Sequence, residues 1–382
     1  MIERLDILKS IEISVQRSPI TALLGPRQIG KTTIAREYAK NKYATFFDLE
    51  SLPDRRRLQN PELVLGSLEG LIILDEIQLM PELFAALRIL VDKPEAKSKF
   101  IILGSASPTL IRNASESLAG RIEFIDLSGF NLLEVGLANI NNLWLRGGFP
   151  RSFLAKSEAD SLAWREGFIR TFLERDIPQL GIQISSVSMR RFWTMLAHYH
   201  AQTWNASEIG RAMGLSDKTV RSYLDVLSGS FMIRQLQPWY ENIGKRQVKA
   251  PKIYLRDSGL AHSLLNIPDY HSLLGHPKIG ASWEGFVIEQ VLQTIRYSEA
   301  YFWATHNGAE LDLLCMINGK RYGFEVKFNE APEVTRSMQT AIHDLELSHL
   351  WIIYPGNETY QIEKQISVLP LQRIHSLDPY FD

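Results

Sequence analysis

Five short runs of apolar residues are spaced along the first 130 positions of the chain. They span residues 20–24, 44–49, 71–75, 100–105 and 122–127. The segments between them place apolar residues three and four positions apart, as in 81–90, which is the spacing of an amphipathic helix. Strands that alternate with helices are typical of a parallel sheet covered by helices on both faces. The pattern therefore predicts an α/β fold for this region.

The middle of the chain changes to a helical pattern followed by a β-rich stretch. Residues 188–201 have helical spacing, and two further short helices are expected on either side of a turn that contains Gly214. Ser216 is placed to cap the second of them. Two short helices joined by such a turn are typical of a helix-turn-helix motif. The stretch from Phe231 to Leu255 resembles a β-wing, so we expect a winged helix-turn-helix over 188–256.

Two alternating apolar runs near the C-terminal end flank Asn318-Gly319. An Asn-Gly pair in this setting is a strong signal for a hairpin with a two-residue loop. The register that this loop sets pairs Ile317 with Lys320, Asp312 with Glu325, and Glu310 with Lys327. Strand side chains repeat every two residues, so the last four share one face. Two opposed carboxylates repel each other unless a cation lies between them.

The first predicted strand leads directly into a phosphate-binding motif of the form G-x-x-x-x-G-K-T. A strand before this motif and a helix after it are the context that the motif requires. Its backbone N–H groups would surround phosphate oxygens, Lys31 would reach the β- and γ-phosphates, and Thr32 would bind Mg²⁺. The alternative is a Gly-containing turn with a chance Lys-Thr pair. The expected nucleotide-binding residues here are Gly25, Pro26, Arg27, Gln28, Ile29, Gly30, Lys31, Thr32 and Thr33.

The third and fourth predicted strands end in polar residues that would lie beside this loop. Asp75 would complete the Mg²⁺ site, and Glu76 would act as general base on the attacking water. The alternative for this pair is a helix cap at the end of a strand. Ser105 is the first candidate for sensing the γ-phosphate and Ser107 the second, although Ser107 is equally well placed to cap a helix.

The predicted winged helix region carries most of the local positive charge. Six basic residues and one acidic residue lie between positions 234 and 256. Such a stretch is the electrostatic signature of contact with a phosphate backbone, and the second helix of the motif would enter a DNA groove. The alternative is a protein-binding winged helix with solvated charges. The candidate DNA contacts are Lys218, Arg221, Lys245, Arg246 and Lys249.

The predicted hairpin resembles the active face of PD-(D/E)xK nucleases, with Asp312 followed by Glu325-Val326-Lys327. The resemblance implies that Asp312 and Glu325 bind a divalent metal, that Glu284 adds a ligand from an upstream helix, and that Lys327 activates water. Leu311 replaces the proline of that motif. The alternative is a solvated hairpin face with a Glu310–Lys327 ion pair, because such cores often persist without activity.

The first 130 residues also resemble an AAA-type ATPase module, through the phosphate loop, Asp75-Glu76, Ser105 and the segment 118–121. In that superfamily an arginine just before the fifth strand reaches the nucleotide of a neighbouring subunit. Arg121 matches this position, which implies a ring or another head-to-tail homo-oligomer; the alternative is a surface arginine. Together with the segment 144–150 and the C-terminal region, the module resembles a prokaryotic family that joins an AAA-type ATPase to a domain of unknown function.

The composition of the chain excludes some kinds of site but identifies no catalytic residue. The chain has 382 residues with 42 basic and 43 acidic side chains, so its overall charge selects no class of partner. The single cysteine excludes an intrachain disulfide framework and a cysteine-based zinc site. We see no signal peptide and no spanning helix, and expect a cytoplasmic protein without membrane contact.

The combined prediction has four segments. They are an AAA-type phosphate-loop ATPase domain at 1–140, a helical lid or linker at 141–187, the winged helix-turn-helix at 188–256 and an α/β nuclease-like domain at 257–382. The favoured function is ATP binding and hydrolysis with Mg²⁺, coupled to DNA contact and a metal-dependent nuclease core. One alternative is a nucleotide-dependent switch that binds a protein and has an inert nuclease-like domain. Another is a DNA-binding regulator with vestigial hydrolysis.

Overall fold

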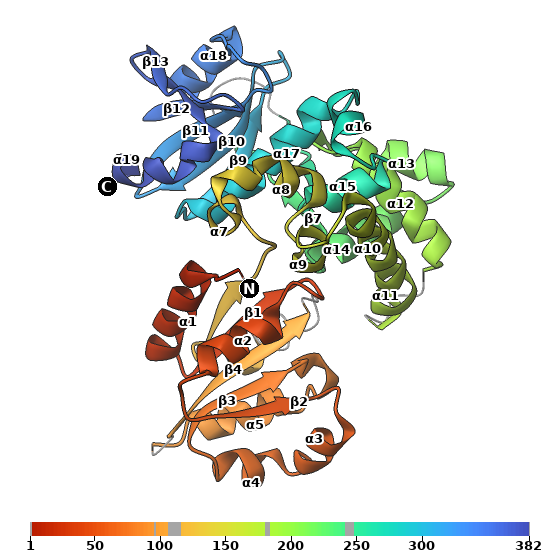
Figure 1. Ribbon diagram of the computed structural model, residues 1–382, viewed down its shortest axis with the longest axis vertical. Coiled ribbons are helices and arrows are strands. Elements are labelled where there is room, and N and C mark those ends of the chain that lie inside the picture. Colours follow the sequence, from red (N-terminus) through yellow and green to blue (C-terminus); the bar gives the residue numbers. More distant parts are fainter. Residues whose placement is uncertain (1, 95–96, 106–115, 180–183, 241–247, 382) are drawn as a thin grey trace. The chain divides into compact units, whose positions relative to one another are not determined.

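The computed structural model describes residues 2–94, 97–105, 116–179, 184–240 and 248–381 (Figure 1). The chain forms two compact units. The first contains residues 1–129 together with 229–231, and the second contains 130–228 and 232–382. The segments predicted after residue 140 therefore fall in the second unit, except for residues 229–231 of the predicted winged helix-turn-helix, which belong to the first. The boundaries among these segments stay predictions.

The first unit is built on a five-stranded parallel sheet, as the apolar pattern predicts. Its strands are β1 (Ile20–Gly25), β2 (Ala44–Asp48), β3 (Gly70–Asp75), β4 (Ser98–Ser105) and β5 (Ile122–Asp126). Their spatial order is β2-β3-β4-β1-β5. The order matters for the site because it pairs Gly25 with Ser105, so the phosphate loop starts directly beside the end of β4.

Helices cover this sheet because their apolar positions share one face. Ile72 and Leu74 of β3 are fully buried and belong to one core cluster with Leu83 and Leu87. Each such side chain contributes about 1.5–3 kcal/mol by leaving water. The helices of the first unit are α1 (Leu5–Arg17), α2 (Lys31–Ala39), α3 (Leu52–Arg57), α4 (Pro61–Gly66), η1 (Ile77–Leu79) and α5 (Leu83–Val91).

The second unit begins with helices packed around buried aromatic residues. The Trp144 ring lies 5.0 Å from that of Trp283 and 6.4 Å from that of Phe286, which joins helices far apart in the sequence. The helices before the C-terminal sheet are α7 (Leu132–Val135), η2 (Leu137–Asn139), α8 (Ile140–Arg146), α9 (Pro150–Phe153), α10 (Glu158–Thr171), η3 (Phe172–Asp176), α11 (Ile177–Gln179), α12 (Ser186–His198), α13 (Ala206–Met213), α14 (Asp217–Gly229), α15 (Ser258–Leu264), α16 (Tyr270–Leu274) and α17 (Ile279–Thr294).

A small antiparallel sheet accompanies α12, α13 and α14. Its strands β6 (Gln202–Thr203), β7 (Ile233–Leu236) and β8 (Lys252–Leu255) lie in the order β6-β8-β7. Two features allow the sharp turn between α13 and α14. A Cβ at Gly210 would lie 2.8 Å from the carbonyl oxygen of Leu215, and Gly214 adopts a φ of +69°. The predicted cap is present, since the Ser216 hydroxyl accepts a hydrogen bond from the Thr219 backbone N–H.

A mixed six-stranded sheet forms the C-terminal part of the second unit. Its order is β13-β14-β12-β11-β10-β9, and α17 and α18 pack against it. The elements are β9 (Glu299–Ala304), β10 (Glu310–Ile317), β11 (Lys320–Val326), α18 (Arg336–Asp344), β12 (His349–Tyr354), β13 (Tyr360–Glu363), β14 (Ile366–Pro370), η4 (Leu371–Leu377) and α19 (Asp378–Phe381).

The predicted hairpin register is confirmed next to the turn, whereas the predicted pairs Asp312–Glu325 and Glu310–Lys327 lie beyond the paired residues. Ile317 pairs with Lys320, and the antiparallel ladder extends to Leu313 and Phe324. Asn318 and Gly319 adopt φ values of 49° and 75°, which suit the left-handed two-residue turn that Asn-Gly favours. On its other side, β10 shifts register against β9 between Leu311 and Leu314. Such a bulge redirects side chains, and here it falls at Asp312.

Within the described part of the chain, no helix has both the length and the apolar character needed to cross a membrane.

Candidate functional site

The phosphate loop lies between β1 and α2, where the motif places it. Gly25 must be a glycine, since a Cβ there would lie 2.4 Å from the Leu127 carbonyl oxygen. Gly30 has a φ of +100°, a conformation that side chains with a Cβ rarely adopt. Gln28 also has a positive φ, of 63°. These turns shape the loop immediately before the first residues of α2.

Lys31 is buried and folds back over this loop. Its ammonium donates to the carbonyl oxygens of Gly25, at 3.0 Å, and Pro26, at 2.8 Å. These are neutral acceptors on a loop of the kind that receives phosphate oxygens. The predicted position of Lys31 at the start of the helix agrees with this geometry.

Thr32 and Asp75 come together across the end of the sheet. The Thr32 hydroxyl donates to the Asp75 carboxylate at 2.7 Å. Burial raises the pKa of Asp75, against the opposing effect of the hydrogen bond from Thr32. A hydroxyl and a carboxylate are hard oxygen ligands of the kind that Mg²⁺ prefers, and the burial penalty on the charged carboxylate is what a bound cation would offset. The two residues thus fit the predicted magnesium role.

Glu76 and Ser105 are connected by a side chain that the sequence analysis missed. The Gln78 amide nitrogen donates to the Glu76 carboxylate and, at 3.1 Å, to the Ser105 hydroxyl. Its amide oxygen is buried without a hydrogen-bond partner among the described residues. Glu76 itself adopts a left-handed backbone with a φ of 56°, which turns the chain out of β3. The sequence signal that could have identified Gln78 is its position two residues after the acidic pair Asp75-Glu76. Ser107 lies outside the described residues.

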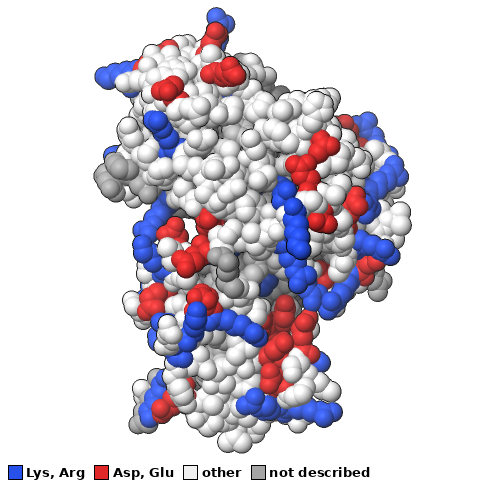
Figure 2. All heavy atoms as spheres, viewed as in Figure 1, with Lys and Arg blue, Asp and Glu red and all other residues white. Residues whose placement is uncertain are grey.

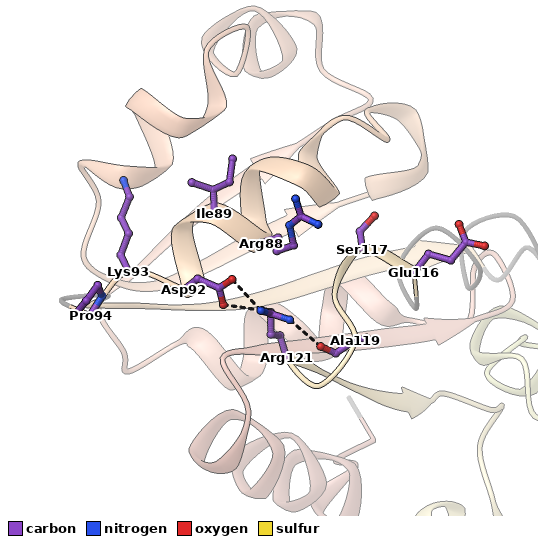
Figure 3. A pocket seen from close by; sticks show the side chains of 9 residues that line it. All are labelled: Arg88, Ile89, Asp92, Lys93, Pro94, Glu116, Ser117, Ala119 and Arg121. Atoms are coloured by element: carbon purple, nitrogen blue, oxygen red, sulfur yellow. Dashed lines mark hydrogen bonds and ion pairs between the residues drawn. The ribbon is translucent and has the colours of Figure 1, made fainter.

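Arg121 lies at the opposite edge of the sheet from the phosphate loop. Its backbone carbonyl accepts a hydrogen bond from Ile20, the first residue of β1, whereas the loop follows the last residue of that strand. The guanidinium donates to both carboxylate oxygens of Asp92, at 2.6 and 2.9 Å, beside a surface pocket that also includes Arg88 and Lys93 (Figure 3). Arg121 is therefore too far from its own phosphate loop to assist there, and any role at a nucleotide requires a neighbouring chain.

In the second unit, two of the predicted metal ligands, Glu284 and Asp312, converge with Glu310 on Lys252, a residue of the basic stretch from 234 to 256. The ammonium of Lys252 lies 3.3 Å from a carboxylate oxygen of Glu284, 3.3 Å from one of Asp312 and 3.4 Å from one of Glu310. The other Asp312 oxygen accepts a hydrogen bond from the Val326 backbone N–H at 3.0 Å. We name this group of four residues, with Glu325 and Lys327, the carboxylate cluster.

Glu325 and Lys327 pair with each other at 2.7 Å. The alternative Glu310–Lys327 ion pair is therefore wrong, because Lys327 follows the end of β11 and turns to the carboxylate two residues before it, while Glu310 contacts Lys252. One Glu325 oxygen is buried and has no hydrogen-bond partner in the described part of the chain.

Burial and neighbouring negative charge alter the protonation of this cluster. Burial first, and then the charge of Asp312, raise the pKa of Glu284 to about 7 and that of Glu325 to about 8. The charges of Tyr254, Glu284 and Asp312 outweigh burial at Lys252 and raise its pKa. Among the described residues, no set of three or more His, Cys, Asp or Glu side chains is arranged to hold a metal ion. With Lys252 in place, the cluster does not fit the predicted metal.

The basic stretch from 234 to 256 is largely committed to ion pairs inside the second unit. Arg234 and Arg256 contact Glu289 at 2.5 and 3.7 Å, and Lys252 is buried. These contacts account for half of the basic residues that suggested DNA binding. Lys218, Arg221 and Lys249 are exposed, whereas Lys245 and Arg246 lie outside the described residues. Figure 2 shows basic and acidic side chains interspersed on the face drawn.

Comparisons with known proteins place these two units in a family. Residues 17–136 match the AAA domain family. Residues 137–271 and 279–374 match families described as domains of unknown function, DUF8612 and DUF4143. The uncharacterized protein Rv2008c of Mycobacterium tuberculosis is 48% identical over 374 residues, covering 98% of this chain and 85% of that protein. The chain therefore belongs to the same family as Rv2008c. The uncharacterized protein Mb2031c of Mycobacterium bovis matches with the same identity and coverage.

A solved structure supports the fold. The Walker-type ATPase paby2304 of Pyrococcus abyssi superposes with a TM-score of 0.50 and 17% identity, covering 69% of this chain and 96% of that protein. With the family match, this confirms the predicted AAA-type phosphate-loop ATPase domain followed by a C-terminal domain.

Proposed function

We propose that the chain binds and hydrolyses ATP in its first unit. The observation that carries this proposal is the convergence of Lys31, Thr32 and Asp75 at the end of a parallel sheet, with Thr32 and Asp75 joined at 2.7 Å. Phosphoryl transfer needs positioned charge more than covalent chemistry, and this edge of the sheet supplies a loop, a lysine and oxygen ligands. Thr32 and Asp75 would hold Mg²⁺, which neutralises phosphate charge when it is bound.

In this proposal Glu76 accepts the proton of the attacking water, and Ser105 contacts the γ-phosphate. Gln78 supports the assignment because its amide bonds to both side chains and so fixes their separation. A residue held between the general base and the γ-phosphate contact is placed to keep both in position before nucleotide arrives.

Two substitutions separate binding from hydrolysis. Lys31→Ala should abolish ATP binding because it removes the charge that reaches the phosphates. Glu76→Gln should preserve binding and lower turnover by about 10²–10⁴-fold, since an amide accepts no proton from water. Fluorescent-nucleotide titration and phosphate release measure the two effects. The matched controls are Lys40→Ala and Glu82→Gln, which change exposed side chains directly after α2 and directly before α5. Wild-type turnover by Glu76→Gln would contradict the general-base assignment.

A second proposed activity is DNA contact through a winged helix-turn-helix. The observation in its favour is the order α12, β6, α13, α14, β7 and β8, with Lys218 and Arg221 exposed near the start of α14. That helix would enter the major groove, and Lys249 would add a backbone contact. The internal ion pairs of Arg234, Lys252 and Arg256 reduce the available positive charge and favour the protein-binding alternative.

Metal-dependent nuclease activity through Asp312, Glu325, Glu284 and Lys327 stays a prediction. It requires a state in which the carboxylates exchange Lys252 for a divalent ion. The contacts of Lys252 favour the alternative of an inert nuclease-like domain.

A further inference from the structure

Lys252 is a buried cation shared by three carboxylates from two elements of the second unit. It lies on β8, Glu284 lies on α17, and Glu310 and Asp312 lie on β10. The residue is 3% exposed, and its ammonium is within 3.4 Å of all three carboxylates. Two residues further along β8, the Tyr254 hydroxyl donates to Glu284 at 2.6 Å.

Burying an ammonium or a carboxylate alone costs free energy, and burying the two in contact offsets part of that cost. An isolated charge inside a protein loses its hydration, and adjacent carboxylates also repel one another. Asp312 is 4% exposed and Glu325 is 4% exposed, so solvent does not screen their repulsion. A proton or a cation among them relieves this repulsion, and Lys252 supplies a cation in contact with the predicted metal ligands Asp312 and Glu284.

We infer that the Lys252 ammonium takes the place of a divalent metal in the carboxylate cluster, so that the wild-type cluster is a set of structural ion pairs and binds no metal. These ion pairs connect β8 to α17 and β10. A second ion pair follows the same path, since Arg234 of β7 contacts Glu289 of α17. Backbone contacts run alongside, with Trp239 N–H donating to the Phe302 carbonyl at 2.7 Å. The ordering of this region comes from these contacts and not from a bound ion.

One Glu325 oxygen is buried without a hydrogen-bond partner among the described residues, while the Lys327 ammonium pairs with the other oxygen. A divalent ion could serve oxygens of Asp312, Glu325 and Glu284 together, but it would repel Lys252 at the same position. Metal binding should therefore appear only when the ammonium is removed.

The test is a calorimetric titration of the full chain with MnCl₂, without nucleotide. The variant Lys252→Met removes the ammonium and keeps a side chain of similar length. The double variant Lys252→Met/Glu310→Gln removes one charge of each sign and retains the three predicted ligands, so it is expected to fold even if the single variant does not. Lys252→Arg is the matched control, because it keeps a cation. Each protein is also made with Asp312→Asn, which identifies binding at the cluster and separates it from Mn²⁺ at Asp75.

We expect no Asp312-dependent site in the wild type or in Lys252→Arg. The single or double Met variant should bind one Mn²⁺ at least about tenfold more tightly than the wild type, with loss of binding on Asp312→Asn. Mn²⁺ should also raise the unfolding temperature of the Met variant, followed by tryptophan fluorescence, because all eight tryptophans lie in the second unit.

Two outcomes would overturn the inference. Equal Asp312-dependent affinity in wild type and variant would show that Lys252 does not occupy the cation position. No binding by the folded double variant would show that the carboxylates form no cation site at all. The experiment uses no ATP, so either result is independent of the proposed hydrolysis.

Discussion

Individual hydrogen bonds fix the protonation of His262 in the second unit. Trp144 donates its indole N–H to the Ser282 hydroxyl at 2.9 Å. That hydroxyl can then donate to Nε2 of His262 at 2.7 Å, while Nδ1–H donates to the Leu145 carbonyl at 3.0 Å. The network suits a neutral imidazole, and burial lowers the pKa of His262 to about 3.

This gives a prediction for the pH dependence of stability. The pKa of His262 is lower in the folded chain than in the unfolded chain, so the unfolded state binds more protons below about pH 6.5. The stabilising contribution is present at neutral pH and declines as pH falls toward 3. The destabilisation caused by His262→Gln should therefore shrink by about 2 kcal/mol between pH 7 and pH 5.

Urea unfolding followed by tryptophan fluorescence measures the difference, since the eight tryptophans report on the second unit only. Comparing the variant with the wild type at each pH removes the opposite contributions of Glu284 and Glu325, whose pKa values are raised. A difference that stays constant from pH 7 to pH 5 would contradict the prediction.

At the scale of elements, α17 and α14 differ in whether their charged side chains are paired or exposed. Glu284 and Glu289 of α17 are matched by Lys252, Arg234 and Arg256, so this helix holds the small sheet. The start of α14 is positioned by Ser207, whose hydroxyl donates to Asp217 at 2.6 Å, and by the Ser216 cap. Lys218 and Arg221 are left exposed. Any DNA contact therefore depends on α14 rather than on β7 or β8.

The variant Lys218→Ala/Arg221→Ala should weaken duplex DNA binding to a similar extent on several sequences. If both side chains contact phosphates, the slope of log affinity against log salt should fall by about 2. Fluorescence anisotropy at several salt concentrations measures this slope. Arg151→Ala/Lys156→Ala is the matched control, at two exposed basic positions elsewhere in the second unit. An unchanged slope in the α14 variant would favour a protein-binding role for this helix.

At the scale of the whole molecule, the phosphate loop and the carboxylate cluster lie in different units, and Arg121 bears on whether one chain is sufficient for ATP hydrolysis. Arg121 lies at the sheet edge away from the loop and pairs with Asp92 in its own chain. An arginine in this position could act at a nucleotide only in a neighbouring copy, as in the head-to-tail homo-oligomer that the resemblance to AAA-type ATPases implies.

Mixing two inactive variants tests this arrangement. Arg121→Ala should lower ATP turnover by about 10³-fold or more if the arginine acts in trans. A mixture of Arg121→Ala and Glu76→Gln should recover part of the activity, because some sites then combine an intact Glu76 with an intact Arg121 from the neighbour. Phosphate release from the mixture is compared with each variant alone. The control Asp92→Ala should retain turnover, since it removes only the intrachain partner. A mixture no more active than its components would exclude a trans role.

The sequence by itself determined the elements whose signals are local. The five apolar runs became the five parallel strands; the three central strands are buried along most of their length, and the edge strands β2 and β5 only in part. The phosphate loop followed from glycine and lysine at fixed spacing, and the register of the C-terminal hairpin followed from Asn318-Gly319, whose backbone preference sets the turn.

Tertiary structure alone decided which charges meet. Lys252 and Arg234 looked like part of a basic surface because sequence shows a charge but not its partner, and their partners lie 32 to 60 residues away. Gln78 gained its place between Glu76 and Ser105 from the adjacency of strand ends that are far apart in the chain. Local patterns fix backbone geometry because its causes are short-range. Electrostatic partners depend on the packing of distant elements, so the identity of the cation among the carboxylates could be read only from the fold.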